Sequence, residues 1–379
     1  MQGWKRDHTV ALVTAAVMLA ACAPWTAGGH PPPHPATSPT GATPPFTTSS
    51  PSASATPSPF SCSDFVSPSL TDGSVPTARR GATFVYDKAS DQTILVGGAA
   101  GQSAGEVPGS TWMWNGTVWT RLHPVSAPPC DRSSAASAYD DFTGQVVLFG
   151  GQGPPQGPPP VGWNKADTWS WDGTSWILRS PATAPPERSW AAMAYLPTVK
   201  RLVMFGGMND LGDTWLWDGH DWTEAASGDP APPGRSNGTL AYDGHQLILF
   251  GGFRFKPGPN YLNDTWAFDG ARWHQLLPAN SPSARSSAGV VQQGPGGVVI
   301  VGGIGETAQA STYYNDMWRW DGANWTKLSN AMPGPANRYF FMTAQDTLRG
   351  LGLLFGGKAG EQDLNDLWAW DGTTWRALP

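Results

Sequence analysis

Apolar and polar positions along this chain follow one pattern that recurs six times. In each copy, two tryptophans seven residues apart flank an Asn-Gly or Asp-Gly dipeptide, and another aromatic residue directly precedes the dipeptide. The pairs are Trp112/Trp119, Trp169/Trp176, Trp215/Trp222, Trp266/Trp273, Trp318/Trp325 and Trp368/Trp375. Alternating residues around such a dipeptide are typical of a two-residue β-hairpin. The pattern therefore predicts six hairpins in which the two tryptophans of each pair lie directly opposite each other.

Two further strands are predicted in front of each hairpin. The nearer one is an apolar run that ends in two glycines, as at 203–207, and paired glycines close a strand where the backbone takes a positive φ or passes close to another segment. The farther one follows an arginine, and in the first four copies it carries a tyrosine seven residues later. The arginines are Arg79, Arg132, Arg188, Arg235, Arg285 and Arg338. Each copy thus predicts four short strands, and the recurrence every 46 to 57 residues indicates a repeat architecture.

These motifs resemble kelch repeats, which carry Gly-Gly after the second strand, an aromatic third strand and a tryptophan in the fourth. The resemblance covers about residues 79 to 379 and implies an all-β fold of the galactose oxidase/kelch-like superfamily, a six-bladed kelch-type β-propeller of four-stranded antiparallel blades. WD40 propellers are the main alternative, but their period of about 40 to 45 residues is shorter and their Gly-His mark is missing. We expect the ring to close without a blade shared between its ends.

The first 22 residues have the pattern of an export signal. Lys5 and Arg6 precede an apolar run that is too short to span a bilayer as a helix. The segment Leu19-Ala20-Ala21-Cys22 resembles a bacterial lipobox, which implies a lipoprotein signal peptide ending at a lipidated Cys22. An ordinary signal peptide is the alternative. We therefore expect an exported protein, lipid-anchored on the outer side of the bacterial cytoplasmic membrane.

Residues 23–60 are rich in Pro, Ser and Thr with almost no charge, so they predict a disordered tether in front of a propeller at 61–379. Two cysteines remain besides the lipobox residue. In an exported protein, an even remainder favours one disulfide, here between Cys62 and Cys130. Two free thiols are the alternative interpretation.

Charge and histidine placement narrow the classes of partner. The formal net charge of −6 and the lack of a Lys/Arg cluster argue against nucleic acid as a partner, and we expect a monomer. The seven histidines lack metal-ligand spacing on any predicted loop cluster, so no metal and no cofactor are predicted. Galactose oxidase, a kelch enzyme, needs histidine and tyrosine ligands for copper, so a copper oxidase is not predicted. A sialidase is expected to carry Asp-box repeats, and the sequence has none.

Strand alternation places the connections between second and third strands, and those between units, on one face. We call it the loop face, because it carries the long variable segments, and recognition commonly lies in such loops. Aromatic and guanidinium side chains there suit sugar stacking or peptide capture. The candidate ligand-binding residues are Trp163, Arg188, Trp190, Arg254, Tyr261, Tyr313, Tyr314, Arg338 and Tyr339. Packing within the loops is the alternative role for each of them.

The six arginines have a second interpretation. Their place in the family implies that they line the central channel, where some kelch adaptors hold acidic peptides. A matching set of aspartates precedes the third strands, namely Asp167, Asp213, Asp264, Asp316 and Asp366. Repetition in nearly every unit favours structural Arg–Asp pairing over a ligand site.

These observations predict a membrane-anchored, extracytoplasmic propeller that acts as a protein- or glycan-binding module of the cell envelope. Enzymatic activity is less favoured, since no constellation of residues nominates a catalytic group. The alternative is a carbohydrate-active enzyme such as a sugar epimerase or mutarotase, which needs only an acid or base in the channel. Scaffolding within an envelope complex is a third possibility.

Overall fold

The computed structural model describes residues 75–99, 110–124, 129, 132–153, 164–225, 230–257, 260–306, 311–328 and 334–379. These residues form six four-stranded antiparallel sheets, each built from four consecutive strands, and contain no helix. The predicted all-β propeller of six blades is confirmed, and no blade is shared between distant parts of the chain.

The strands of each blade are described by their order in the sequence. The first strands are β1 (Thr83–Asp87), β5 (Ala136–Asp140), β9 (Ala192–Leu196), β13 (Thr239–Tyr242), β17 (Gly289–Gln292) and β21 (Met342–Asp346). The second strands are β2 (Gln92–Val96), β6 (Gln145–Phe149), β10 (Arg201–Gly207), β14 (Leu247–Arg254), β18 (Val298–Glu306) and β22 (Leu351–Ala359). The third strands are β3 (Thr111–Trp114), β7 (Thr168–Trp171), β11 (Leu211–Trp217), β15 (Asn260–Phe268), β19 (Ser311–Trp320) and β23 (Gln362–Trp370). The fourth strands are β4 (Trp119–Leu122), β8 (Trp176–Arg179), β12 (Trp222–Glu224), β16 (Trp273–Leu276), β20 (Trp325–Leu328) and β24 (Trp375–Leu378).

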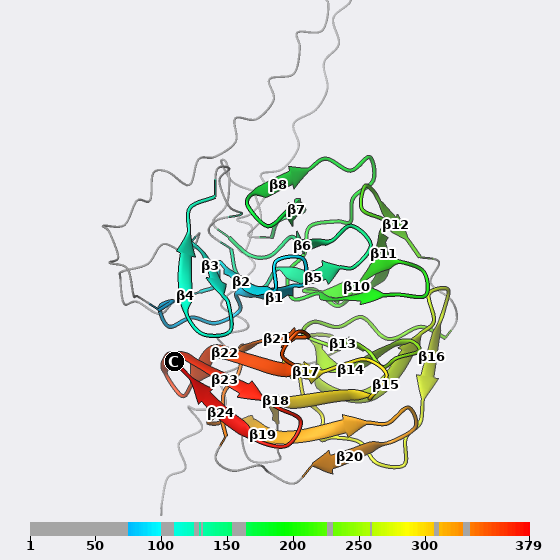
Figure 1. The fold of residues 1–379 in the computed structure, drawn as a ribbon. Helices are drawn as coiled ribbons and strands as arrows, with labels where there is room; N and C mark the ends of the chain where they lie inside the picture. Colours follow the sequence, from blue (N-terminus) through cyan, green and yellow to red (C-terminus); the bar gives the residue numbers. More distant parts are fainter. Residues whose placement is uncertain are drawn as a thin grey trace, which may run out of the picture. The chain divides into compact units, whose positions relative to one another are not determined.

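The blades close into a ring around their first strands. Each first strand contacts the first strands of both neighbouring blades, including β1 with β21. Strands such as β1, β5 and β21 accordingly lie near the centre of the domain, with β4, β8, β12, β16, β20 and β24 around its perimeter (Figure 1). Six apolar clusters fill the six interfaces between blades, and one of them joins blade 6 to blade 1. The ring is therefore closed by the same kind of core that packs every other pair of blades.

The register of the outer hairpins differs from the prediction. Trp176 lies opposite Trp171 rather than opposite Trp169, and Trp169 faces Leu178. The reason is a four-residue turn in which Asp172 Oδ1 accepts hydrogen bonds from the N–H groups of the residues two and three positions later, at 2.9 and 2.8 Å. The same shift occurs in all six blades. The Asp or Asn side chain, rather than the glycine alone, sets the turn length.

The fourth-strand tryptophans tie neighbouring blades together. Trp176, Trp222, Trp273 and Trp325 each donate their indole N–H to a threonine hydroxyl at the third strand of the preceding blade, at 2.9 to 3.2 Å. These indoles are at most 3% exposed. Buried aromatics with a satisfied polar atom combine a large apolar area with a directional contact. The tryptophan pattern thus belongs to the core.

The sequence predicts that the paired glycines end each second strand, and in blade 3 strand β10 does end at Gly207. In blades 4 to 6, by contrast, strands β14, β18 and β22 pass through the pair with a shift of register and continue toward the loop face. In blade 4, a Cβ on Gly251 would lie 2.5 Å from the carbonyl oxygen of Arg285 in the next blade, and Gly252 N–H donates to this same oxygen at 2.8 Å. The glycines therefore form a bulge that admits the backbone of the neighbouring blade.

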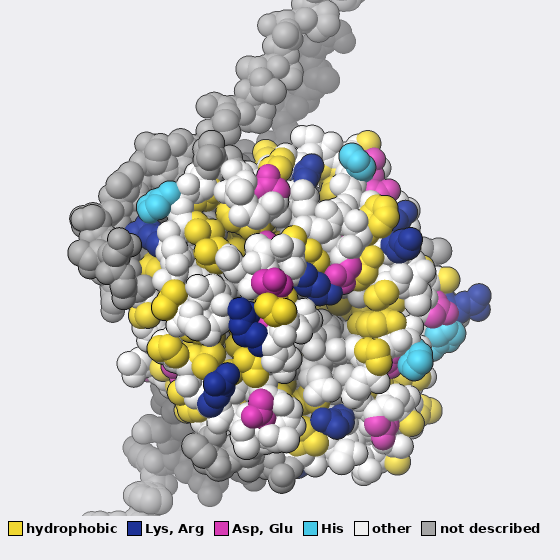
Figure 2. Space-filling view, viewed as in Figure 1, with side chains coloured by type: hydrophobic (Ala, Val, Ile, Leu, Met, Phe, Trp, Pro, Cys, Tyr) yellow, Lys and Arg dark blue, Asp and Glu magenta, His cyan; other side chains and the backbone are white. Residues whose placement is uncertain are grey.

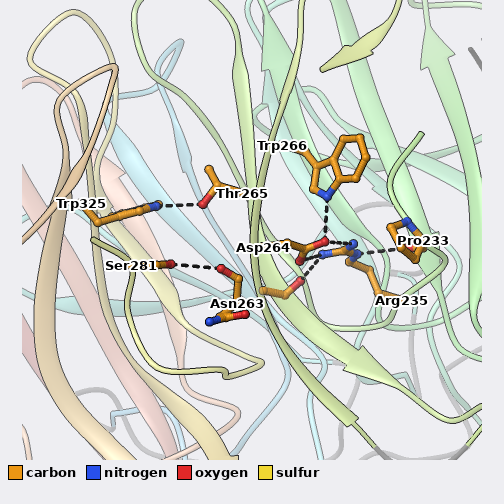
Figure 3. A network of polar contacts seen from close by, with 9 residues as sticks. Pro233, Arg235, Asn263, Asp264, Thr265, Trp266, Ser281 and Trp325 are labelled. Carbon is orange, nitrogen blue, oxygen red and sulfur yellow. Dashed lines mark hydrogen bonds and ion pairs between the residues drawn. The ribbon is translucent and has the colours of Figure 1, made fainter. Parts of the chain in front are cut away.

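The predicted Arg–Asp pairing is confirmed. In blade 4, both terminal nitrogens of Arg235 contact the carboxylate of Asp264 at 2.6 and 2.8 Å, and Trp266 Nε1 donates to the same carboxylate at 2.7 Å (Figure 3). Arg235 also donates to the carbonyl oxygens of Pro233 and Gly251. Equivalent pairs occur in blades 2, 3, 5 and 6. Each pair fixes the segment that leads into the first strand to the third strand or, in blade 2, to the residue directly before it.

Candidate functional site

The loop-face end of the channel is encircled by residues that lie two positions after each arginine. All six have a positive φ of 50 to 60°: Gly81, Ser134, Trp190, Asn237, Ser287 and Phe340. Their backbones are joined from blade to blade, with N–H donating to the carbonyl of the preceding blade in five bonds of 2.7 to 3.0 Å. One of these bonds runs from Gly81 N–H to the oxygen of Phe340 and links blades 1 and 6. We call this ring the backbone belt.

Two positions of the backbone belt carry bulky aromatic residues. Gly, Asn and Ser accept a left-handed conformation at modest cost, whereas a tryptophan or phenylalanine with φ of 60° or 53° is an outlier. Trp190 in blade 3 and Phe340 in blade 6 nevertheless occupy it, and their rings stack with centroids 6.4 Å apart and planes 14° apart. Residues from opposite blades thus meet at the mouth of the channel. Backbone strain of this kind persists mainly at functional sites.

The stack continues into the predicted residues of blades 5 and 6. The Tyr339 ring contacts Phe340 at 5.1 Å, and Tyr313 stacks on Tyr339 at 5.0 Å and 18°. We call Trp190, Phe340, Tyr339 and Tyr313 the loop-face aromatic cluster. Burial raises the pKa of Tyr339, an effect that the nearby carboxylates of Glu361 and Asp363 reinforce and Arg80 opposes. The cluster therefore places two buried rings, Trp190 and Tyr339, and two half-buried rings, Phe340 and Tyr313, beside ionised groups.

A departure from the repeat supplies those charges. Arg80 occupies the position that serine takes in blades 2 to 5, and it forms an ion pair at 2.6 Å with Asp363 of blade 6. The Arg80 side chain is 28% exposed, whereas Asp363 is nearly buried. The pair crosses the seam between the first and last blades, beside Tyr339.

Other predicted residues lie near the aromatic cluster with different contacts. Tyr261 packs edge-on against Phe253 at 5.0 Å, and burial raises its pKa to about 12, together with the charges of Glu306, Tyr313 and Tyr314. The Tyr314 ring covers the guanidinium of Arg285 at 4.0 Å. Arg254 is half-buried at the end of β14.

Two predicted arginines lie in the buried pairs. Arg188 contacts Asp213 at 2.7 Å and is 1% exposed, and Arg338 contacts Asp366 at 2.5 Å and is 3% exposed. Burial opposes ionisation of Asp213 and Asp366, but hydrogen bonds from the arginine and tryptophan prevail and hold the pKa of each carboxyl below its usual value. The structure places these guanidinium groups in the framework rather than in an open mouth.

Beneath the aromatic cluster lies the loop-face chamber, a cavity of about 250 Å³. It is lined by the belt residues together with small and apolar side chains from the first strands, and no ionisable side chain is among the described residues around it. Asn237 Nδ2 and Ser287 Oγ are buried here without a hydrogen-bond partner among the described residues. The described lining of this chamber therefore offers neutral polar groups.

The opposite end of the channel, which we call the turn face because the tight turns between first and second strands lie there, holds a larger cavity that the sequence does not predict. This turn-face chamber, of about 460 Å³, is bounded by the tyrosines of the Arg/Tyr motif, Tyr86, Tyr139, Tyr195 and Tyr242. Lys88 and Asp141 are its only charged lining residues within the described part of the chain. Four residues, Phe84, Ser137, Met193 and Thr343, line both chambers and mark the boundary between them.

Several predictions fall outside the described residues: the roles of Trp163, Cys22, Cys62 and Cys130, and the boundaries of the signal peptide and tether. Over the described ranges, no cluster of His, Cys, Asp or Glu has the arrangement of a metal site. A search of these same ranges finds no helix of the length and apolarity needed to cross a membrane. On the face of the domain shown in Figure 2, positive and negative side chains are interspersed.

Comparison with known proteins agrees with the architecture. Residues 163–347 match the model of the KLHDC2/KLHL20/DRC7 Kelch-repeats domain. The chain is similar to the flagellar outer arm dynein alpha chain of Chlamydomonas reinhardtii, with 32% identity over 138 residues, which is 34% of this chain and 3% of that protein. The chain thus spans only a small fraction of that relative.

Among solved structures, the chain is similar to YjhT, with a TM-score of 0.60 and 16% identity over 80% of this chain and 99% of that one. At this identity the likeness concerns the fold. The matched residues 163–347 are similar to kelch repeats and lie within a closed six-bladed β-propeller.

Proposed function

We propose that this protein is an exported, lipid-anchored binding module that engages a protein or glycan of the cell envelope through its loop face. The observation that carries the proposal is the stack of Trp190 on Phe340, two aromatic residues held in a backbone conformation that suits glycine or asparagine. Aromatic rings gathered at the mouth of a rigid scaffold are a common basis for recognition.

The substitution Trp190→Asn tests this role, because Asn237 occupies the equivalent position in blade 4 with a φ of 50°. The variant keeps a residue type that the belt accepts and removes the aromatic surface. The full chain and the variant would be compared on glycan arrays and in pull-downs from envelope extracts. We expect binding of a defined glycan or protein to fall at least tenfold in the variant.

Phe142→Ser provides a matched control, since Phe142 is an exposed aromatic residue on the turn face (55% exposed). It should retain full binding. Binding that survives Trp190→Asn, or that Phe142→Ser abolishes equally, would refute the loop-face assignment.

Membrane attachment is proposed from the lipobox-like segment that ends at Cys22. Cells fed a clickable palmitate analogue should label the wild-type chain, and Cys22→Ser should remove the label and release the protein from the membrane fraction. Retention of label in Cys22→Ser would contradict the anchor.

The alternative, a sugar epimerase or mutarotase, requires an acid or base beside the bound sugar. The described lining of the loop-face chamber offers none, and the ionisable groups lie instead in the turn-face chamber. Turnover of a free sugar that is unaffected by Trp190→Asn would favour this alternative.

A further inference from the structure

The turn-face chamber has the composition of a site for a cation. Three half-buried tyrosines, Tyr139, Tyr195 and Tyr242, come from blades 2 to 4 and line it beside the buried Tyr86. Its volume of about 460 Å³ lies within the range of small-molecule sites. The faces of aromatic rings attract ammonium groups, and quaternary ammonium ligands are recognised by cages of such rings.

A cation of the chain itself already occupies the edge of this chamber. Lys88 Nζ lies 5.6 Å from the centroid of the Tyr139 ring and 2.6 Å from Asp141 Oδ1. Both side chains are more than a third exposed, so solvent screens the pair and its contribution to stability is small. The contact shows that an ammonium group fits between an aromatic face and a carboxylate at this place.

Buried carboxylates behind the tyrosines add negative potential. Asp87 and Asp140 are each 1% exposed and are held by neutral donors, for example Ser90 Oγ at 2.7 Å and Thr143 Oγ1 at 2.8 Å. Asp346 is equally buried, but it pairs with Arg349 at 2.8 Å. Burial raises the pKa values of Tyr86, Tyr139 and Tyr195, and nearby carboxylates add to this effect, chiefly Asp346 at Tyr86, Asp87 at Tyr139 and Asp140 at Tyr195.

Blades 5 and 6 leave little competing polarity. In blades 5 and 6 the position of the motif tyrosine is occupied by glutamine, Gln292 and Gln345. Gln345 Nε2 donates to the backbone oxygen of Gln293 at 3.3 Å. Gln293 Oε1 in turn accepts from Tyr242 N–H at 3.1 Å. Each of these two side-chain amides is thus bonded to a backbone group of the wall, which leaves the tyrosine rings and Asp141 as the groups that a cation would meet.

We propose that the turn-face chamber binds a small organic cation, a quaternary ammonium or protonated alkylamine, against Tyr139, Tyr195 and Tyr242, and that Lys88 competes with this ligand. An anion would face the field of Asp87, Asp140 and Asp141 with Lys88 as its only nearby lining cation among the described residues. This site lies at the other end of the channel from the loop-face aromatic cluster, and it is independent of the proposed loop-face function.

Titration of the full chain with tetramethylammonium chloride, followed by calorimetry against a sodium chloride reference at equal ionic strength, tests the proposal. We expect saturable binding with a dissociation constant on the order of millimolar. Tyr195→Leu should weaken it about five- to tenfold, the effect of one ring. Lys88→Gln should strengthen it about threefold, because the competing ammonium is gone.

Two controls separate this site from the loop face. Trp190→Asn and Phe142→Ser should leave tetramethylammonium affinity unchanged. Absence of saturable binding to both the wild-type chain and Lys88→Gln would overturn the proposal. Weaker binding in Lys88→Gln would do the same, as would equally strong binding of neutral glucose that Tyr195→Leu reduces. Because Lys88 is at the surface, the Lys88→Gln result stands even if Tyr195→Leu fails to fold.

Discussion

The two ends of the central channel are stabilised by different kinds of contact, although every blade contributes to both. At the loop face, Arg–Asp pairs with buried arginines hold blades 2 to 6, the backbone belt links neighbouring blades, and two belt positions carry aromatic residues against their backbone preference. At the turn face, aspartates cap their own tight turns, and the charged pair of Lys88 with Asp141 is exposed. Buried ion pairs and strained backbone are therefore concentrated at the loop face, where we place macromolecular recognition, whereas the pocket at the turn face is bordered by an exposed ion pair.

The largest expected effect comes from removing one of the Arg–Asp pairs at the loop face, which we call pins. Arg235→Met leaves the carboxylate of Asp264 without its cation, and the lost guanidinium is fully buried. Breaking a buried pair from one side costs about 3–5 kcal/mol. Urea unfolding of the full chain should show this loss of stability. A cost below about 1 kcal/mol would mean that the pins do not make the loop-face end rigid.

Acid should weaken the loop-face end first. Hydrogen bonds and the charge of the paired arginine hold the pKa of Asp264 below its usual value of 3.8, despite an opposing contribution from burial. A depressed folded-state pKa gives stability that is present above 3.8 and is lost as the pH falls through the folded value. Unfolding free energies measured from pH 7 down to 3 should therefore drop steeply only below about pH 4.

Asp140 at the turn face should behave in the reverse way, because burial raises its pKa. Its protonation favours the folded state as the pH falls toward 4, and its charge costs stability at neutral pH. In Asp140→Asn this small gain on acidification should disappear. An identical pH profile in the variant and the wild type would contradict the difference between the two ends.

The strain at the belt predicts a smaller effect on stability than on binding. Phe340→Asn loses apolar contacts of a half-buried ring but relieves a left-handed conformation that costs on the order of 1–3 kcal/mol. We expect the unfolding free energy to change by no more than about 1 kcal/mol. Ligand capture at the loop face should nevertheless fall. A destabilisation above about 3 kcal/mol would show that Phe340 is an ordinary core residue.

The smallest effect belongs to the exposed turn-face pair. Lys88→Gln should change the unfolding free energy by less than about 1 kcal/mol, because solvent screens this ion pair. The same urea measurement sharpens the contrast with Arg235→Met. An effect of several kcal/mol would place the turn face among the rigid parts of the ring.

Much of the fold can be predicted from the sequence because the same motifs recur in each of the six repeats. Six tryptophan hairpins, six glycine pairs and five Arg–Asp pairs each report a local contact that the ring reuses. The hairpin register was wrong because the hydrogen bonds of Asp172 lengthen the turn, a choice that the Asp-Gly dipeptide alone does not reveal. The prediction that the glycine pair ends the second strand is wrong in blades 4 to 6, where the pair forms a bulge in close contact with the next blade.

The candidate site was less accessible, since it depends on which blades face one another. Trp190 was nominated, but its partner Phe340 was missed. Aligning the residues two positions after each arginine would have exposed both as aromatic substitutions among Gly, Ser and Asn. The tyrosines were noticed as a motif. These tyrosines line one cavity because the blades close into a ring, and the spacing of residues within one blade does not reveal that closure.

The backbone belt has a consequence for how the polypeptide can be wired. The bond from Gly81 to Phe340 joins the last blade to the first with the geometry of the bonds between covalently successive blades. The contact between blades 6 and 1 is therefore equivalent to the contacts between blades that follow each other in the chain. A circular permutant opened beside Leu277, which is 87% exposed between blades 4 and 5, should assemble the same six sheets from a different starting point.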